Sequence, residues 1–578
     1  MVGYGEAGGV ATLERSTADG HRPGVRIDVD GLTRRVRVGK RDRATLLDAV
    51  SFTVSAGELV AIVGPSGAGK TTLLETIAGV TSPTSGSVRF DGVDLHANLR
   101  TFRGVLGFVP QDDIIHADLP LERTLRYAAR LRLPSSTTMA AVDDAVRDAL
   151  DAVGLSESAE VRVGALSGGQ RKRASIAVEL ITDPHIFFLD EPTSGLDPIT
   201  SAELVTRLRD LADRSATVVF TTHSVADLTV CDRIVFMTRG GSVGFVGTLQ
   251  EALERFGVSS VPQLYCVLAE VESATSAPST ATPSPGTSPR SASPPASNRP
   301  VANGFTQWRV LTRRTLDTIL RNHLTLAILV GSPALVVGMF AILFRPGAFD
   351  VQDPSPSSMV MIGFWVVFAA FFFGLTYGLL QICTERSILR RERLVGLRLG
   401  AYVASKVTVL VPFLLLVVVA MLAVLRGLDR LPSRSVSTYA SLGVTLLLCA
   451  VAALSLGLLA SASVGNVAQA TLALPMLCFP AVLFSGAILP VSVMARTGQV
   501  LSAWIPTRWA FEGVGHDLGA RRILAEGNSR LGPPLLESYG NAGTQSTVIY
   551  WLILGGFATA FLTGTWLVLV RSTQRSTR

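Results

Sequence analysis

Glycines, a lysine and a threonine stand close together in the segment GPSGAGKT, residues 64–71. The segment follows the apolar run LVAIV and opens the helical stretch TLLETIAG. In that strand–loop–helix context, backbone N–H groups close around phosphate oxygens at the positive end of the helix. Lys70 would reach the β- and γ-phosphates of a nucleotide, and the Thr71 hydroxyl would bind Mg²⁺; a chance glycine-rich turn would do neither. The residues predicted to bind nucleotide here are Gly64, Pro65, Ser66, Gly67, Ala68, Gly69, Lys70, Thr71 and Thr72.

Acidic side chains end a second apolar run, IFFLDE at residues 186–191. Asp190 suits the shell of a Mg²⁺ ion, which prefers few carboxylates and several waters. Glu191 follows directly and is placed to polarise an attacking water. The alternative is a pair of acids that cap the next helix. His223 follows the run TVVFTT, at another strand end where open α/β sheets place ligand groups, so we predict a contact with the γ-phosphate rather than a structural role.

Three further motifs complete the set of predicted site residues. Gln111, in FVPQDD, joins a strand to a mostly helical stretch, and we predict that it contacts Mg²⁺ and the attacking water. The segment LSGGQ resembles a second phosphate cradle because small residues precede a basic helix. Asp197 closes the segment SGLD and is grouped with the nucleotide-binding residues. The cradle residues are Ser167, Gly168, Gly169 and Gln170.

An α/β domain is expected to position these residues. Between residues 26 and 270, short β-branched runs alternate with amphipathic helical stretches. Residues 1–25 are predicted to be a disordered tail without the apolar core of a signal peptide. Residues 271–303 consist mainly of Ser, Thr, Pro and Ala, which cannot form a core, so they are predicted to be a disordered linker. Its Ser-Pro pairs are either plain spacer or phosphorylation sites.

The remainder of the chain, residues 304–578, is predicted to be an all-α membrane domain. The sequence is 48% hydrophobic with a net charge of +7, and its mean hydropathy is +0.41. Arginines cluster beside apolar segments, which favours a membrane over nucleic acid as the partner. A helix at 305–323 has an apolar face and arginines on the other side, and it either lies on the membrane or packs on the α/β domain. Six spans are predicted at about 324–344, 359–381, 407–425, 438–462, 467–489 and 548–570.

Basic residues set the expected orientation of the spans. The loop CTERSILRRERLVGLRLGAYVASK is rich in arginine, as are the regions before the first span and after the sixth. The positive-inside rule therefore places both termini and the ATP-using domain in the cytoplasm of a multi-pass inner-membrane protein. The loop at 426–437, with Arg426, Arg430 and Arg434, goes against this rule. Pro333, Pro475 and Pro480 are expected to lie within helices, where they produce kinks.

In this order and spacing, GPSGAGKT, Gln111, LSGGQ, IFFLDE, SGLD and His223 resemble an ATP-binding-cassette (ABC) ATPase. More narrowly, the chain resembles the subfamily G half-transporters, of bacterial type, in which the ATPase precedes six spans. The resemblance implies that two ATPase domains sandwich ATP head to tail, so that Ser167 and its glycines complete the partner's site. A homodimer is expected, and a mixed dimer is the alternative. The family's usual adenine-stacking aromatic is missing, and only Val36 or Val38 stands near its place.

The spans lack convincing charged residues, so the predicted cavity is apolar. We therefore expect a lipid-like or hydrophobic substrate. Because the ATPase and the membrane domain are fused in one chain, we expect an exporter that moves this substrate out of the cytoplasm or the inner leaflet. The alternative is a non-transporting membrane ATPase that transmits force or a signal to an outer partner. Charges in the basic loop are predicted to couple the spans to the ATPase, unless they serve orientation alone. These candidate coupling residues are Glu385, Arg386, Arg391, Glu392 and Arg393.

Overall fold

The computed structural model of the chain describes residues 24–38, 42–102, 104–112, 114–261, 263–264, 267, 302–350, 354–527, 529–540 and 542–577. Most of the expected N-terminal tail and linker therefore lies outside the described residues. The chain divides near residue 301 into two compact units, and each is described by itself below. The predicted α/β domain followed by an all-α domain is confirmed.

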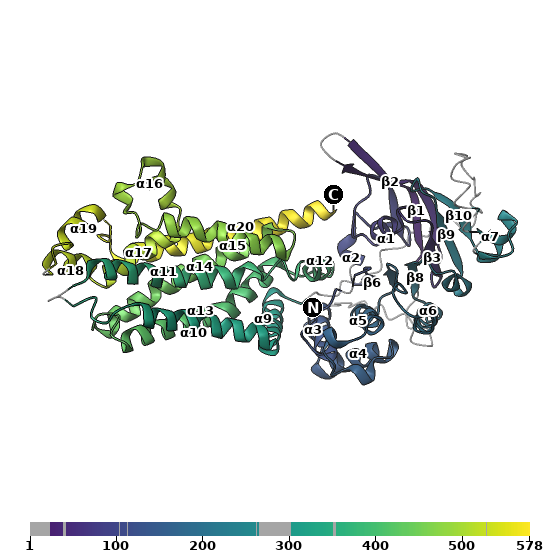
Figure 1. Ribbon diagram of the computed structural model, residues 1–578. Helices are drawn as coiled ribbons and strands as arrows, with labels where there is room; N and C mark the ends of the chain where they lie inside the picture. Colours follow the sequence, from purple (N-terminus) through teal and green to yellow (C-terminus); the bar gives the residue numbers. More distant parts are fainter. Residues whose placement is uncertain are drawn as a thin grey trace, which may run out of the picture. The chain divides into compact units, whose positions relative to one another are not determined.

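A six-stranded, mostly parallel sheet forms the centre of the N-terminal unit (Figure 1). Its strands β3, β7 and β8 are buried along their whole length, as expected for a sheet covered on both faces. Only β10 runs antiparallel to its neighbour. The order is β10 (Val243–Gly247), β9 (Arg233–Met237), β3 (Leu59–Val63), β8 (Thr217–Thr221), β7 (Ile186–Leu189) and β6 (Leu106–Val109).

A smaller antiparallel sheet packs on one face of the central sheet. Because successive side chains of a strand point to opposite faces, β3 contributes to two cores. Val60 and Ile62 pack with residues of the antiparallel sheet, whereas Leu59, Ala61 and Val63 pack with the helices on the other face. The antiparallel order is β2 (Asp42–Val54), β1 (Ile27–Val38), β4 (Ser85–Phe90) and β5 (Val93–Asp94).

Helices complete the N-terminal unit, and a buried ion pair ties two of them together. The guanidinium of Arg132, at the end of α3, donates to both carboxylate oxygens of Glu179 on α5, at 2.7 and 2.8 Å. This bidentate geometry fixes α5 against α3. The helices are α1 (Lys70–Ile77), α2 (Leu99–Phe102), α3 (Leu121–Arg132), α4 (Met139–Ala152), α5 (Gly168–Leu180), α6 (Pro198–Asp213) and α7 (Leu249–Phe256), with short 3₁₀ segments at Ser156–Ser158, Val163–Ala165 and Ala226–Val230.

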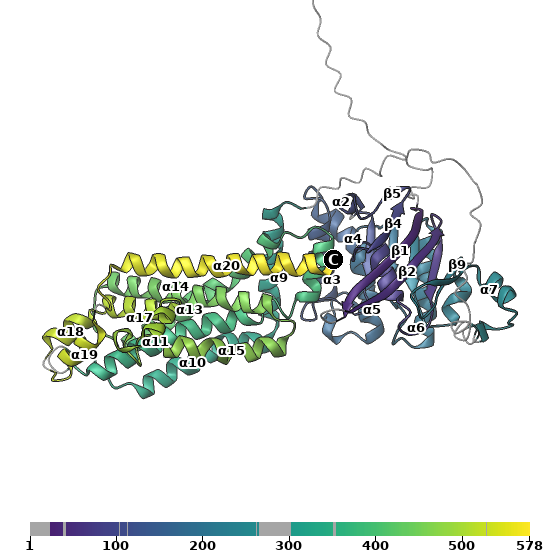
Figure 2. The same cartoon turned by 90° about the horizontal axis from the view of Figure 1, so that it is seen from above.

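The C-terminal unit is helical, and its long helices run roughly parallel (Figures 1 and 2). Among the described residues, five helices are long and apolar enough to cross a membrane: α10, α11, α13, α14 and α20. The fifth predicted span, 467–489, contains a helix of 17 residues that ends at Leu483. The helices are α9 (Gly304–Arg321), α10 (His323–Leu343), α11 (Pro356–Leu379), α12 (Arg386–Leu394), α13 (Leu399–Gly427), α14 (Val436–Ser463), α15 (Val467–Leu483), α16 (Arg496–Ala503), α17 (Pro506–Asp517), α18 (Ala520–Glu526), α19 (Gly532–Tyr539) and α20 (Thr547–Thr577), and the short 3₁₀ segment is Val491–Val493.

Glycines bring α11 and α14 into close contact. A Cβ atom on Gly374 would lie 2.1 Å from the carbonyl oxygen of Ala450, and one on Gly378 would lie 2.4 Å from that of Leu454. On the facing helix, a Cβ atom on Gly457 would lie 2.5 Å from the carbonyl oxygen of Leu375. Small residues at such a crossing let two backbones approach, which is the usual way that helices pack tightly in a membrane.

The arginines that contradict the orientation rule have local partners. Arg430 donates to the carbonyl of Ala341 in the last turn of α10 at 3.0 Å, and Arg434 donates to the carbonyl of Leu518 just past α17 at 3.4 Å. Carbonyls at a helix C-terminus lack partners within the helix and carry partial negative charge, which an arginine compensates. Arg430 and Arg434 thus cap helix ends, whereas Arg426 donates to the Ser433 hydroxyl at 2.8 Å.

Candidate functional site

Four neighbouring parallel strands end at one edge of the central sheet, and each is followed by a predicted site segment. The segment GPSGAGKT follows β3, and Gln111 follows β6. Asp190 and Glu191 follow β7, and His223 follows β8. Because these four strands are neighbours, their carboxyl ends bring the segments together, as the Brändén rule for open α/β sheets describes.

The loop after β3 has a backbone that only glycine adopts readily. Gly67 and Gly69 have φ values of 82° and 88°, in the left-handed region. A Cβ atom at Gly69 would lie 2.6 Å from the carbonyl oxygen of Leu46, so this position has no room for a side chain. Gly69 is also the N-cap residue of α1. The loop therefore delivers the backbone directly to a helix N-terminus, where anions bind.

Lys70 is buried within this loop. Its ammonium group donates to the carbonyls of Gly64 at 2.9 Å and Pro65 at 3.0 Å. Burial lowers the pKa of Lys70, while the nearby carboxylates of Glu191 and Asp190 oppose that change. A cation held by two loop carbonyls in a glycine-rich turn fits a bound triphosphate, which would replace weak carbonyl acceptors with charged oxygens.

Asp190 is buried and accepts two hydroxyl hydrogen bonds. The Thr71 hydroxyl donates at 3.1 Å, and the Thr221 hydroxyl donates at 2.7 Å. The Thr221 hydroxyl also accepts a bond from the backbone N–H of Glu191 at 2.8 Å. The adjacent oxygens of Thr71 and Asp190 are the hard ligands that Mg²⁺ prefers, so this pair fits the ion. Thr221 was not among the residues predicted from the sequence, although it lies two residues before His223.

Glu191 is the meeting point of the three predicted catalytic residues. Its carboxylate accepts a bond from Nε2 of Gln111 at 3.0 Å, and Nε2 of His223 lies 2.6 Å from its other oxygen. Glu191 has a φ of 46°, in a region that residues other than glycine seldom occupy. Such backbone strain is typical of functional sites, where the surrounding structure holds it. The structure thus brings Gln111, Glu191 and His223 together.

The residues of the predicted second cradle lie at the start of α5. Ser167 is its N-cap residue and forms a capping box with Gln170, whose backbone N–H donates to Oγ of Ser167 at 3.2 Å. Ser167 and Gly168 are exposed, and a Cβ atom on Gly168 would have no neighbour within 4 Å. Within the described part of the chain, no hydrogen bond or ion pair links residues 167–170 to residues 64–72. These exposed residues are therefore available to a second molecule.

Asp197 caps the next helix in the same manner. Its carboxylate accepts bonds from the backbone N–H groups of Ile199 and Thr200 at 3.1 and 3.0 Å, and from the Thr200 hydroxyl at 2.6 Å. The bonds from Thr200, first that of its hydroxyl, lower the pKa of Asp197. Its contacts are local to the start of α6, and its predicted role toward nucleotide stays a prediction.

Lys172 connects α5, the helix that begins within LSGGQ, to the segment around Gln111. Its side chain is buried, and Nζ donates to the backbone carbonyl of Gln111 at 2.7 Å. This bond ties α5 to the backbone of Gln111. From the sequence, the basic residues after LSGGQ indicated only a charged helix, and the contact of Lys172 with Gln111 was not predicted.

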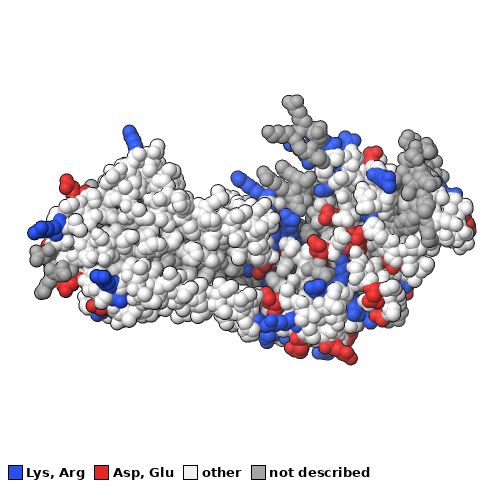
Figure 3. All heavy atoms as spheres, in the orientation of Figure 1, with Lys and Arg blue, Asp and Glu red and all other residues white. Residues whose placement is uncertain are grey.

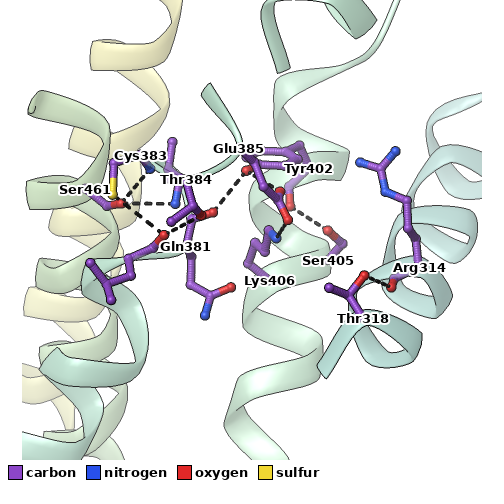
Figure 4. A network of polar contacts seen from close by, with 12 residues as sticks. Arg314, Thr318, Gln381, Cys383, Thr384, Glu385, Tyr402, Ser405, Lys406 and Ser461 are labelled. Carbon is purple, nitrogen blue, oxygen red and sulfur yellow. Dashed lines mark hydrogen bonds and ion pairs between the residues drawn. The ribbon is translucent and has the colours of Figure 1, made fainter. Parts of the chain in front are cut away.

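The candidate coupling residues are bound inside the C-terminal unit. Glu385, just before α12, accepts bonds from Lys406 at 2.8 Å and from the Tyr402 hydroxyl at 3.0 Å (Figure 4). Arg386 donates to the carbonyl of Val464, which follows α14. Residues in and beside α12 are thus fastened to both α13 and α14.

A buried ion pair joins α12 to α9. Arg314 donates to both carboxylate oxygens of Glu392, and the bond from Nη2 to Oε2 measures 3.1 Å. The expectation that all arginines of helix 305–323 lie opposite its apolar face is therefore wrong for Arg314. The guanidinium is buried because Glu392 compensates its charge, and this partner lies far away in the sequence. The packing of α9 on α13 also settles which unit α9 belongs to.

Comparison with known proteins identifies two families along the chain. Residues 47–194 match the ABC transporter family, and residues 306–516 match the ABC-2 type transporter family. An ABC transporter ATP-binding/permease protein of Mycobacterium tuberculosis is 34% identical over 499 residues, which is 84% of this chain and 56% of that protein. ABC transporter G family member 22 of Arabidopsis thaliana is 38% identical over 220 residues, 36% of this chain and 29% of its own.

A third relative matches the N-terminal unit. The Nod factor export ATP-binding protein I of Rhizobium meliloti is 34% identical over 230 residues, which is 40% of this chain and 66% of that protein. The chain thus spans about half the length of the mycobacterial relative, 29% of the Arabidopsis relative and 66% of the rhizobial relative.

Proposed function

Because this chain belongs to the ABC transporters, with an ATP-binding domain ahead of an ABC-2 type membrane domain, we propose that it is an ATP-driven exporter that works as a homodimer. The observation that carries the proposal is the separation of two half-sites on one chain. The glycine loop, Asp190 and Glu191 form one half-site, while the exposed start of α5 at Ser167 forms the other. A second copy in head-to-tail orientation would supply the missing half to each nucleotide.

Within each site, the chain's own groups have separate roles. The backbone of residues 64–69, with Lys70, binds the phosphates of ATP. Thr71 and Asp190 would hold Mg²⁺, which would neutralise charge on the phosphate oxygens. Glu191 polarises the attacking water, and His223 contacts the γ-phosphate. Gln111, whose amide donates to Glu191, would contact the ion and the water, and Lys172 ties the backbone of Gln111 to α5.

The apolar helices of the C-terminal unit support our proposal for the substrate class. Figure 3 shows few charged side chains on this unit between its two ends. Such a surface suits the multi-pass membrane protein that its apolar helices indicate. We infer that the substrate is lipid-like or hydrophobic and leaves the cytoplasm or the inner leaflet of the cell membrane, with the ATPase domain and both termini on the cytoplasmic side. One relative is itself named for export, which supports this direction.

Reconstitution into liposomes tests the proposal. ATPase activity is measured with a panel of lipids, glycolipids and hydrophobic drugs, and transport of any stimulating compound is then followed in vesicles whose ATPase domains face outward. Stimulation and ATP-dependent uptake of one class, both abolished in Lys70→Ala, are expected. If the protein hydrolyses ATP but no compound stimulates it or moves, export is contradicted, and the alternative of force or signal transmission to an outer partner gains support.

A further inference from the structure

One face of α9 carries an exposed stripe of apolar and basic side chains. The side chains of Phe305, Leu316 and Leu320 are 69%, 39% and 48% exposed. Arg309 and Arg313 are exposed as well. At about 100° per residue, these five positions fall within an arc of roughly 80° on the helix. The stripe is therefore a continuous surface and is called the α9 stripe below.

The opposite face of α9 is already occupied. Leu311, Arg314 and Ile319 are buried, the helix packs on α13, and Arg314 is paired with Glu392. Trp308 donates to the Thr408 hydroxyl of α13 at 3.1 Å. The orientation of α9 about its own axis is thus fixed by packing, and the α9 stripe must face away from the helix bundle.

The α9 stripe lies close in the sequence to a helix that is able to cross a membrane. Only Asn322 separates α9 from α10, which is one of the helices able to cross a membrane. In Figure 1, α9 lies across the end of the helix bundle, whereas α10 runs along it. Amphipathic helices that carry arginines and large apolar side chains lie in the interfacial layer of a bilayer. The leucines of the stripe are nearest α10, and the arginines precede them.

We propose that the α9 stripe is a binding site for anionic phospholipid headgroups. Phe305, Leu316 and Leu320 would enter the upper acyl region, and Arg309 and Arg313 would bind lipid phosphates. Neither arginine has an ion pair or side-chain hydrogen bond to any residue in the described part of the chain. Two adjacent guanidinium groups repel each other when unpaired, and phosphate oxygens match their fork geometry.

Photocrosslinking in vesicles tests this proposal. The full-length protein carries p-benzoylphenylalanine in place of Phe305 and is reconstituted into phosphatidylcholine vesicles with a minor fraction of phosphatidylglycerol. Mass spectrometry then gives the ratio of phosphatidylglycerol to phosphatidylcholine among the lipid adducts. We expect this ratio to exceed the bulk ratio by about five-fold for each arginine that contributes. Arg309→Gln with Arg313→Gln should return the ratio to the bulk value.

A matched charge change provides the control. Arg345 and Arg496 are also exposed but lie outside α9, so Arg345→Gln with Arg496→Gln should leave the enrichment intact. Adducts in bulk proportion, adducts only to a protein segment of the same or a second chain, or no adducts at all would overturn the proposal. ATPase activity measured on the same samples is a separate readout. Lipid enrichment can fail while hydrolysis persists, so this test is independent of the proposed export function.

Discussion

The hydroxyl of Thr221 donates to the carboxylate of Asp190 at 2.7 Å. It also accepts the backbone N–H of Glu191, so one side chain of β8 fixes both acids that follow β7. The hydroxyl is buried and both donates and accepts a bond, which makes Thr221 a positioning residue for the proposed ion ligand and for the residue that activates water. This relationship can be tested without touching either acid.

Thr221→Val keeps the shape of the side chain but removes both bonds. Loss of a buried bond to a charged group costs about 1.5–3 kcal/mol, and each 1.4 kcal/mol of barrier is about ten-fold in rate. We therefore expect the hydrolysis rate to fall by roughly ten-fold or more and the Mg²⁺ concentration for half-maximal activity to rise. Thr221→Ser keeps the hydroxyl and should remain close to wild type. Equal rates and Mg²⁺ requirements in the valine and serine variants would refute the positioning role.

Lys70→Met should abolish ATP binding while the protein remains folded. Burial lowers the pKa of Lys70 below the ordinary value of 10.5, so in the nucleotide-free protein the charged lysine destabilises the fold. At pH values between the lowered pKa and 10.5, Lys70 is protonated more in the unfolded state than in the folded state. The contribution of Lys70 to the free energy of unfolding therefore rises with pH. Thermal unfolding followed against pH should therefore show that the methionine variant is no less stable at neutral pH. Wild-type affinity for a fluorescent ATP analogue would count against the loop assignment.

The sequence predicted the candidate site residues that directly follow apolar strands, because the end of a buried strand marks where the next side chains reach the edge of the sheet. It did not predict Thr221 or Lys172, because their roles depend on contacts with segments far away in the chain. Periodicity also placed Arg314 on the solvent side, since a pattern of apolar residues cannot reveal a distant compensating carboxylate such as Glu392. The apolar composition of residues 467–489 likewise gave no sign that the helix ends at Leu483.

Arg314 and Glu392 should behave as a buried ion pair. Arg314→Met alone removes the charge that compensates the buried carboxylate of Glu392 and should lower stability by about 3–5 kcal/mol. The double change Arg314→Met with Glu392→Met removes both charges and should recover much of that loss. The thermal midpoint of the detergent-solubilised protein measures both effects. Glu392→Met is measured as the second single variant. If the double variant loses as much stability as the two single variants together, the two residues do not interact.

Gly378→Ala tests the close contact of α11 with α14. The new methyl group would lie 2.4 Å from a carbonyl oxygen of α14, so the helices must separate, at a cost of about 1–3 kcal/mol. Gly331→Ala is the matched control, because a Cβ atom there has no neighbour within 4 Å and alanine favours the helix. We expect a lower thermal midpoint for the first variant only. Equal midpoints would mean that the two helices are not in tight contact.

The site shared between two chains is tested by mixing two inactive variants. Gly168→Arg should block the half-site that the start of α5 offers to a partner, and open space around Gly168 leaves its own chain undisturbed. Ser167→Arg serves the same purpose but also removes the N-cap of α5, which costs about 1 kcal/mol. Glu191→Gln removes the group that polarises water and should accumulate a closed, ATP-loaded dimer. Gly168→Arg and Glu191→Gln should each leave ATP binding to the glycine loop largely intact.

The decisive measurement is the ATPase rate of mixed dimers, purified through different tags on the Gly168→Arg chain and the Glu191→Gln chain. If Gly168 of one chain completes the site of the other, one site carries both defects and one carries neither, so the rate should recover to as much as about half of wild type. Cysteines placed at positions 67 and 167 should then cross-link between chains. If mixed dimers are as inactive as their parents and no cross-link forms between chains, the two-chain ATP site is contradicted.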